Sequence, residues 1–400
     1  MAELSREPER RRRVFLHIGS PKTGTTFLQQ VLWSQRELAA EQGVLLPLKR
    51  FNDHYQASLD IRGMATPNSP HEAAQGMWTR LVSDAAGWPG TVLVSHELFA
   101  AADDAQARRA ITSFGPGVEV HVVLTVRDLL RQLSAEWQEH VKHRSTMRFD
   151  EFVASVKKDA PSRSGWFWRV QDYVRLVDRW GAGLPPARVH VVTVPPPGAP
   201  PTLLWSRFAG LLGLDPDSFE TAASRANTSL GREQAEILRQ VNVALDGRLA
   251  LPGPYPAVVK DVFAHQVLAG RTGNRLALDA ADTQFALEQS RALAEGLAAA
   301  GVDVVGSLDE LVPIEDAATV SAAAGAYEPP APDVLLQESL AAMADLLVKL
   351  SDVTERNRDA VQRADVLHRA PVRAALLELG ERHPSLLRAR ATVQRLRDRR

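Results

Sequence analysis

Hydroxyl and ammonium groups crowd around two glycines near the start of the chain, where residues 19–26 read GSPKTGTT. The residues that follow the first glycine are Ser20, Pro21, Lys22, Thr23, Gly24, Thr25 and Thr26. Glycines let backbone N–H groups turn toward one point, and a lysine adds a full positive charge there. Threonine and serine hydroxyls supply further hydrogen-bond donors. This combination predicts a binding site for a phosphate-like anion.

The elements on either side of this stretch support the same prediction. Residues 14–18 are apolar or β-favouring and predict a short buried strand. Apolar residues then recur at helical spacing, at Phe27, Leu28, Val31 and Leu32. A helix therefore opens near Thr25, and its dipole adds partial positive charge at the glycines. The simpler alternative is a glycine turn that only joins a strand to a helix, which accounts for Gly24 but not for Lys22.

The position of the lysine separates two kinds of anion-binding loop. A nucleotide triphosphatase loop reads G-x-x-x-x-G-K-[ST], with the lysine after the second glycine. Here Gly19 and Gly24 have that separation, but Thr25 stands in the lysine position and Lys22 lies two residues before Gly24. The sequence PKTGTT directly after a strand resembles the 5′-phosphosulfate loop of sulfotransferases. The resemblance implies a bacterial-type, P-loop-like enzyme that uses 3′-phosphoadenosine 5′-phosphosulfate (PAPS) and releases 3′-phosphoadenosine 5′-phosphate (PAP).

A second motif about a hundred residues further on extends the resemblance. Residues 119–126 predict a strand that ends at Arg127, and Ser134 lies about two turns into the helix that follows. In the family, such an Arg and Ser hold the 3′-phosphate of the donor, and a late Arg-x-Gly turn, here at Arg271, contacts the same group. An Arg fork suits a phosphate dianion. The chain departs from the family at Leu129, where a proline is usual, and at Ser134, which usually stands one position later.

A candidate base follows another predicted strand, residues 91–95. His96 and Glu97 come directly after it, where functional groups gather in open α/β sheets, and either side chain can accept a proton. The alternative is that one of them caps the helix that begins near Leu98. Cytosolic members of the family use a His after the equivalent strand, and others use a Glu elsewhere. We favour His96 and keep Glu97 as the alternative.

Composition limits the other classes of function. The chain has 400 residues, of which 45% are hydrophobic and 24% charged. Its 47 basic and 48 acidic residues nearly balance, so the overall charge gives no reason to expect nucleic acid as a partner. It has no cysteine, which excludes disulfides and thiolate metal sites. No apolar run approaches the ~18 residues of a membrane span, and the polar start lacks the apolar segment of a secretory signal. We therefore expect a cytoplasmic protein.

The expected fold class is α/β, a three-layer P-loop-like fold with a central parallel sheet, plus a C-terminal helical extension. The expected parts are a disordered lead-in (1–13), a catalytic domain (14–313), a linker (314–332) and a helical extension with a basic tail (333–400), for which a coiled coil is one alternative. Further expected strands are residues 44–48, 188–194 and 302–305, and further helices are 72–86, 103–113, 166–180 and 203–214. Residues 143–165 are polar and basic, and we expect either a lid or acceptor-facing wall, or a solvated surface.

Apolar residues in the extension alternate four and three apart, at Leu336, Leu340, Met343, Leu347 and Leu350. This heptad seam predicts either packing against the main domain or self-association into a homo-oligomer.

Three functions stay open on the sequence. The first is sulfuryl transfer from PAPS to a hydroxyl or amine of a small-molecule or glycan acceptor, with Lys22 stabilising the leaving phosphate and no metal required. The second is a P-loop kinase that transfers phosphate from ATP and needs magnesium. The third is a nucleotide-binding scaffold without catalysis, built around the C-terminal helices.

Overall fold

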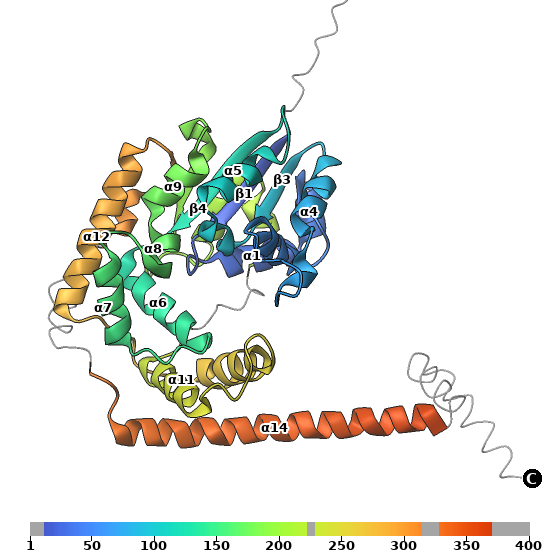
Figure 1. Ribbon diagram of the computed structural model, residues 1–400, viewed down its shortest axis with the longest axis vertical. Coiled ribbons are helices and arrows are strands. Elements are labelled where there is room, and N and C mark those ends of the chain that lie inside the picture. The colour runs from blue at the N-terminus through green and yellow to red at the C-terminus, as the bar shows by residue number, and fades with distance from the viewer. Residues whose placement is uncertain (1–11, 222–228, 314–327, 370–400) are drawn as a thin grey trace, which may run out of the picture. The chain divides into compact units, whose positions relative to one another are not determined.

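A sheet of six parallel strands, in the order β2-β3-β1-β4-β5-β6, forms the centre of the larger part of the chain (Figure 1). The computed structural model describes residues 12–221, 229–313 and 328–369. The strands are β1 (Arg13–Gly19), β2 (Val44–Leu45), β3 (Thr91–Ser95), β4 (Glu119–Val126), β5 (Val189–Thr193) and β6 (Asp303–Val305). The fold class expected from the sequence, an α/β fold around a parallel sheet with a C-terminal helix, is confirmed.

The central strands are buried on both faces, which explains their continuous runs of Val, Leu and Ile. Val14 of β1 lies opposite Val92 of β3 on one side and Val120 of β4 on the other. Because all the strands are parallel, their carboxyl ends meet at one edge of the sheet. Gly19, Ser95 and Val126 end β1, β3 and β4 at that edge, so the residues that follow them are brought together.

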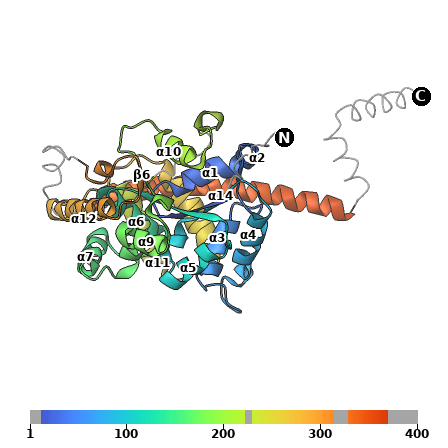
Figure 2. The same ribbon diagram turned by 90° about the horizontal axis from the view of Figure 1, so that it is seen from above.

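Helices cover both faces of the sheet. Figure 2 shows α1, α2 and α10 on one side and α3, α4 and α5 on the other. The helices of this part are α1 (Thr25–Ser34), α2 (Arg36–Glu41), α3 (Asp53–Ile61), α4 (Met77–Ala86), α5 (Asp104–Thr112), α6 (Leu129–Lys142), α7 (Phe149–Asp159), α8 (Gly165–Gln171), α9 (Tyr173–Gly181), α10 (Leu203–Leu212), α11 (Arg232–Leu245) and α12 (Ala280–Ala299). Shorter helical turns are η1 (Glu72–Ala74), η2 (Glu97–Ala101), η3 (Pro186–Arg188), η4 (Pro216–Ser218), η6 (Leu268–Gly270) and η7 (Leu308–Leu311), and η5 (Pro256–Val267) is a π-helix.

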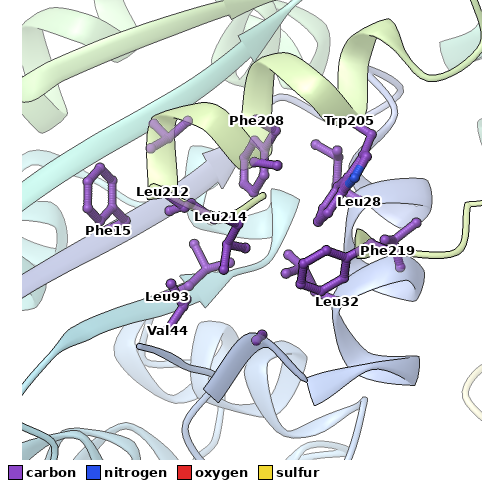
Figure 3. Packing of buried hydrophobic residues seen from close by; sticks show 14 of the residues in the cluster. Phe15, Leu28, Leu32, Val44, Leu93, Trp205, Phe208, Leu212, Leu214 and Phe219 are labelled. Atoms are coloured by element: carbon purple, nitrogen blue, oxygen red, sulfur yellow. The ribbon is translucent and has the colours of Figure 1, made fainter. Parts of the chain in front are cut away.

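The apolar cluster between α1, α10 and the sheet fixes the helix that follows the glycine loop (Figure 3). Leu28 and Leu32 of α1 pack in the same cluster as Trp205 and Phe208 of α10, and all four are at most 1% exposed. Burying side chains of this size stabilises the fold by about 1.5–3 kcal/mol each. The direction of α1, and with it the loop at its start, is therefore set by a rigid apolar contact.

The structure departs from the expected elements in several places. The helix expected over 72–86 is divided into η1 and α4, because Gly76 between them has a left-handed conformation, and the strand expected over 44–48 is limited to Val44–Leu45. The helix expected over 166–180 is broken at Asp172, whose carboxylate accepts a hydrogen bond from the backbone N–H of Arg175 and begins α9 separately from α8. The segment 143–165 contains α7, whose Phe149, Phe152 and Val153 are buried. That buried face makes α7 part of the packed structure.

The second compact unit begins at Asp333, and its described part is the single helix α14 (Pro332–Arg369). The seam residues Leu336, Leu340, Met343, Leu347 and Leu350 are each more than half exposed. The expected lead-in (except Arg12 and Arg13), most of the expected linker and the basic tail lie outside the described residues. Within the described ranges, no helix combines the length and the apolar character needed to cross a membrane.

Two buried histidines, His17 of β1 and His54 of α3, predict acid sensitivity. His54 donates from Nε2 to the Pro47 carbonyl and accepts the Ser95 N–H at Nδ1, so the neutral ring is the form that fits. Burial lowers the pKa of His54 to about 4 and that of His17 to about 3. Below pH 6.5 the unfolded chain protonates while the folded chain does not, so stability is lost as pH falls. We expect a loss of about 1.4 kcal/mol per pH unit for each histidine from pH 6.5 to 4.

Denaturant unfolding at several pH values measures this loss. His54→Gln keeps one donor and one acceptor but cannot titrate, so its stability should fall less steeply with acid than that of the wild type. The matched control is His71→Gln, at a partly exposed histidine, which should leave the slope unchanged. An unchanged slope in His54→Gln would contradict the assignment.

Candidate functional site: an anion cradle beside a charged helix

The loop between β1 and α1 bends through three residues of positive φ. Gly19 has φ 112°, Lys22 has φ 63° and Gly24 has φ 83°. A Cβ on Gly19 would lie 2.9 Å from the backbone oxygen of Glu97, and one on Gly24 would lie 2.5 Å from Leu204. Both positions therefore favour glycine for conformation, and Gly19 also requires it for space, because its near neighbour is backbone. Positive φ at these three residues turns the chain sharply, which is typical of loops that bind anions through backbone N–H groups.

The first N–H groups of α1 have no side-chain cap. Gly24 occupies the N-cap position and offers no side-chain cap to the first N–H groups of the helix. Ser20 is fully buried, and its hydroxyl has no hydrogen-bond partner in the described part of the chain. Uncapped N–H groups and an unsatisfied hydroxyl beside a helix N-terminus are donors that an anionic ligand would satisfy. A phosphosulfate group therefore fits this loop chemically.

Thr23 has a different role from the one its hydroxyl suggests in the sequence. It is buried, and its Oγ1 lies 2.5 Å from both the Ser20 carbonyl oxygen and Thr125 Oγ1. Thr125 also donates to the carbonyl of Gly19, and its own carbonyl accepts the Ser20 N–H at 3.0 Å. Thr23 thus ties the loop down to β4. Thr25 is also buried, while Thr26 is partly exposed.

Lys22 is not held by the loop but by α6. Its ammonium forms a close ion pair with Glu139, which also accepts a hydrogen bond from Lys260 at 2.8 Å. His143 lies 2.9 Å from the same carboxylate. Burial raises the pKa of Glu139, but His143, Lys22 and Lys260 outweigh it and hold that pKa well below its usual range. Glu139 is therefore ionised and compensates the charge of Lys22.

Arg127 follows β4 and is linked to the loop through one side chain. Its Nε donates to Gln132 Oε1 at 2.9 Å, and Gln132 Nε2 donates to the carbonyl of Pro21 at 2.6 Å. The hydroxyl of Tyr173 donates to the backbone carbonyl of Arg127 at 2.8 Å. Burial and the nearby Arg131 lower the pKa of Arg127 to about 10, so the guanidinium stays charged at neutral pH. Arg127 and Lys22 therefore lie at the same edge of the sheet, joined through α6.

Glu136 is a buried carboxyl group between these two cations. It is 2% exposed and accepts a hydrogen bond from Gln171 at 3.0 Å. Burial raises its pKa to about 7, although Lys22 and Arg127 act in the opposite direction. Glu136 is thus the group of this site that titrates near neutral pH. A ligand that brings negative charge would favour its neutral form further.

His96 and Glu97 lie against the other side of the loop. His96 accepts the backbone N–H of Leu98 at Nδ1, 3.2 Å, so it caps η2 as the alternative interpretation of the sequence expected. Burial lowers the pKa of His96. Glu97 Oε2 accepts a hydrogen bond from Gln29 at 3.3 Å. Burial raises the pKa of Glu97, but His96, Gln29 and Lys22 are among the groups that bring it below its usual value. Glu97 is ionised and able to accept a proton.

The structure does not bring Ser134 to the loop. Residues two apart on a helix differ by about 200° in direction, since each residue turns the helix by about 100°. Gln132 points at the loop, so Ser134 points away, and its Oγ donates to the carbonyl of Leu276 at 3.5 Å. Arg271 begins the segment that leads to Leu276, and this segment is hydrogen-bonded to the start of α11. Ser134 and the Arg271 segment therefore meet on the opposite side of α6 from Lys22.

Several residues of this site were missed in the sequence. Gln132, Glu136 and Glu139 recur every three or four positions along α6, beside its apolar positions Leu133 and Trp137. A polar stripe next to the apolar face of a helix is the signal that could have found them, because such residues are buried only with partners. Among the described residues, no group of three His, Asp or Glu side chains is arranged to hold a metal ion.

Comparisons with known proteins give one weak likeness. No family model and no curated protein matches the chain. A solved structure of a sulfotransferase from Alicyclobacillus acidocaldarius aligns over 61% of this chain and 95% of its own, with 19% sequence identity and a TM-score of 0.35. At this identity and TM-score, the likeness does not define the family or the activity of this chain.

The raised pKa of Glu136 predicts that its ionisation costs stability. The unfolded carboxyl loses its proton near pH 4.5 and the folded one near pH 7, so the stability that the protonated form provides is complete below pH 4.5 and is lost as pH rises through 7. Glu136→Gln keeps a neutral acceptor for Gln171. At pH 8 it should be more stable than the wild type by up to about 3 kcal/mol, from 1.36 kcal/mol per pKa unit.

Urea unfolding of both proteins at pH 5 and pH 8 measures the difference. The control Glu37→Gln replaces an exposed glutamate of α2 and should show no pH-dependent gain. If Glu136→Gln gains no stability between pH 5 and pH 8, Glu136 does not titrate in this range.

Proposed function

We propose that the chain is a sulfotransferase that moves a sulfuryl group from PAPS to a hydroxyl or amine acceptor. The observation that carries the proposal is the loop of residues 19–26, with uncapped N–H groups at the start of α1 and a lysine that precedes its second glycine. Arg127 supports it, because Gln132 connects its guanidinium to the same loop. Two anion-binding groups at one edge of the sheet suit a nucleotide with phosphates at both its 5′ and 3′ positions.

The transfer requires charge stabilisation and one proton acceptor. When bound, PAPS supplies the sulfuryl group: a bond forms from the acceptor oxygen or nitrogen to sulfur, the bond from sulfur to the 5′-phosphate oxygen breaks, and the acceptor loses a proton. Lys22 and the N–H groups of the loop stabilise the negative charge that develops on the phosphate oxygen. Ser20 donates to the same group from below. Lys22 must leave its ion pair with Glu139 to do so.

Arg127 binds the 3′-phosphate in this proposal. Its guanidinium is held by Gln132 and by the carbonyl of Arg131, and Tyr173 fixes its backbone. This preorganisation reduces the entropy that binding costs. Ser134, the expected partner of Arg127 for this phosphate, donates to the carbonyl of Leu276 and stays a candidate. Arg271 stays a candidate on its own segment, which Gln234 joins to α11.

Glu97 is the base that we favour for the acceptor proton. It is ionised, and its backbone packs against Gly19 of the loop. His96 accepts a backbone N–H at Nδ1, so its neutral ring carries the proton on Nε2 and has no free lone pair there. His96 positions η2 and, with it, Glu97. For His96 to act as the base instead, its hydrogen bond from the backbone N–H of Leu98 would have to break.

The two other functions make different demands. A kinase of the P-loop class needs a lysine after the second glycine, and Thr25 occupies that position. A scaffold without catalysis gives no reason for a buried hydroxyl without a partner at Ser20 or an ionised Glu97 beside the loop. Both alternatives are outcomes of the experiments below. The cytoplasmic location and the hydroxyl, amine or glycan nature of the acceptor belong to the same proposal.

Lys22→Ala tests the sulfuryl-transfer proposal. Removing the charged donor that stabilises the leaving oxygen should lower turnover by about 100-fold or more, which is the usual cost of losing one such donor. The readout is transfer of labelled sulfate from PAPS to a panel of hydroxyl and amine acceptors. Lys49→Ala, at an exposed lysine, is the matched control and should retain full turnover.

Calorimetry with PAP and ATP, each with and without Mg²⁺, accompanies this assay. We expect the wild type to bind PAP more tightly than ATP, without need of the metal. Full turnover in Lys22→Ala would contradict the mechanism. Tighter binding of ATP that depends on Mg²⁺ would support the kinase, and PAP binding without transfer to any acceptor would support the scaffold.

We also propose that α14 associates with α14 of a second copy of the chain. Its heptad seam is regular and exposed, and two identical seams are complementary to each other. Replacing Leu340 and Leu347 by Ser should abolish the dimer in sedimentation equilibrium. The control replaces Val334 and Val348, which are exposed on the same helix but off the seam, by Ser and should leave the dimer intact. A wild type that is monomeric at micromolar concentration would overturn this proposal.

A further inference from the structure

Further basic side chains lie near Lys22, on α6 and on η5, outside the loop of residues 19–26. Lys142 on α6 and Lys260 on the π-helix η5 lie around the same carboxylate, Glu139, that binds Lys22. Lys260 Nζ lies 2.7 Å from His143 Nε2, and His265 of η5 faces Lys142 and Lys260. We define the cationic cluster as Lys142, His143, Lys260 and His265.

Lys142 has no counter-ion of its own. It is 8% exposed, yet its ammonium makes no hydrogen bond or ion pair with any residue that the structure describes. Burial, Lys22 and Lys260 lower its pKa to about 8, so it is still charged at neutral pH. Among the described residues, Lys142 Nζ is not one of the buried atoms that lack a partner, so the charged end of this side chain reaches the surface. An accessible ammonium without a counter-ion can bind the negative charge of a ligand.

A count of charges supports the same conclusion. Lys22, Lys142 and Lys260 carry three positive charges around Glu139, which supplies one negative charge. Because the pKa of Glu136 is about 7, this group supplies only part of a second negative charge at neutral pH. When a donor nucleotide binds Lys22, Glu139 stays paired with Lys260. Lys142 still lacks a partner in that state.

A shallow, open cavity of ≈490 Å³ adjoins the cluster and shares His143 with it. The cavity is lined by His140, His143, Arg144, Ser145 and Leu251. Its size is that of a site for a small molecule or a sugar unit, and its lining contains basic and neutral side chains but no carboxylate. The π-helix η5 contributes Lys260 to the cluster, and irregular helices of this kind are frequent at functional sites.

We propose that Lys142, Lys260 and His143 bind an anionic group of the acceptor, so that the acceptor is a molecule that already carries a sulfate, phosphate or carboxylate. This inference rests on the proposed sulfuryl transfer. Glu139 lies between the cluster and Lys22, so the anionic group of the acceptor and the phosphosulfate of the donor occupy separate positions on either side of one carboxylate. A neutral acceptor of the same shape leaves Lys142 unpaired and binds more weakly.

The test uses the full chain saturated with PAP, so that the donor loop is occupied. The probes are N-acetylglucosamine 6-sulfate, N-acetylglucosamine and inorganic sulfate, each titrated by calorimetry. We expect the sulfated sugar to bind at least tenfold more tightly than the neutral one. Lys142→Met and Lys260→Met keep the apolar stem but remove the charge, and each should abolish this preference. Lys142→Met should change the Kd of PAP less than twofold, whereas Lys260→Met also removes the cation that compensates Glu139 when the donor binds Lys22. Lys49→Met, at an exposed lysine, is the control.

Each other outcome overturns the inference. Equal binding of the two sugars by the wild type excludes an anion-selective acceptor site. A loss of PAP affinity equal to the loss of sugar affinity assigns the cluster to the donor. Binding of inorganic sulfate that is unchanged in both variants identifies an adventitious ion only.

Two further measurements keep the test decisive. Lys142→Arg retains the charge and should keep the preference for the sulfated sugar, which separates loss of charge from loss of folding. Lys260 is only half-buried, so its substitution is a second variant with little effect on packing. The same sugar titrations without PAP test the cluster if the wild type does not bind PAP. A sulfated-sugar preference without PAP binding would thus retain the anion site and reject the proposed donor.

Discussion

The loop after β1 depends on a polar stripe along α6. Gln132 donates to the carbonyl of Pro21, and Glu139 binds the ammonium of Lys22, so two consecutive loop residues are held by one helix. Gln171 adds a second donor to Pro21 and a hydrogen bond to Glu136. On the opposite side, Thr23 ties the loop to β4. The arrangement of the candidate site is therefore a property of β1, β4 and α6 together.

Most of the fold could be predicted because its signals are local. The strands β1, β3, β4 and β5 are short runs of Val, Leu and Ile ended by Gly, Ser or polar residues, and buried parallel strands read in that way. The helix start at Thr25 follows from the glycine before it and the apolar spacing after it. The break at Asp172 was missed, since an aromatic-rich stretch reads as one helix unless the capping role of that aspartate is recognised.

The candidate site could be predicted only in part, for a geometric reason. Lys22 and Arg127 stand at strand ends, and the topology alone brings strand ends together. Ser134 stands on a helix, where a shift of one residue turns the side chain by about 100°. Contacts between α6, the loop and η5 determine the roles of Glu136, Glu139, Lys142 and Lys260. The sequence of any one of these segments alone does not predict such contacts.

The ion pair between Lys22 and Glu139 has a consequence for selectivity. An anion that reaches Lys22 must replace a carboxylate that is already there, so the exchange gives less net energy than binding to a bare ammonium would. Chloride or free inorganic phosphate would contact only Lys22, so its binding would not compensate for the loss of the ion pair with Glu139. A ligand long enough to engage a second cation at the same time offsets the lost pair. Under the proposed function, the carboxylate of Glu139 therefore favours ligands with two anionic groups over small single anions.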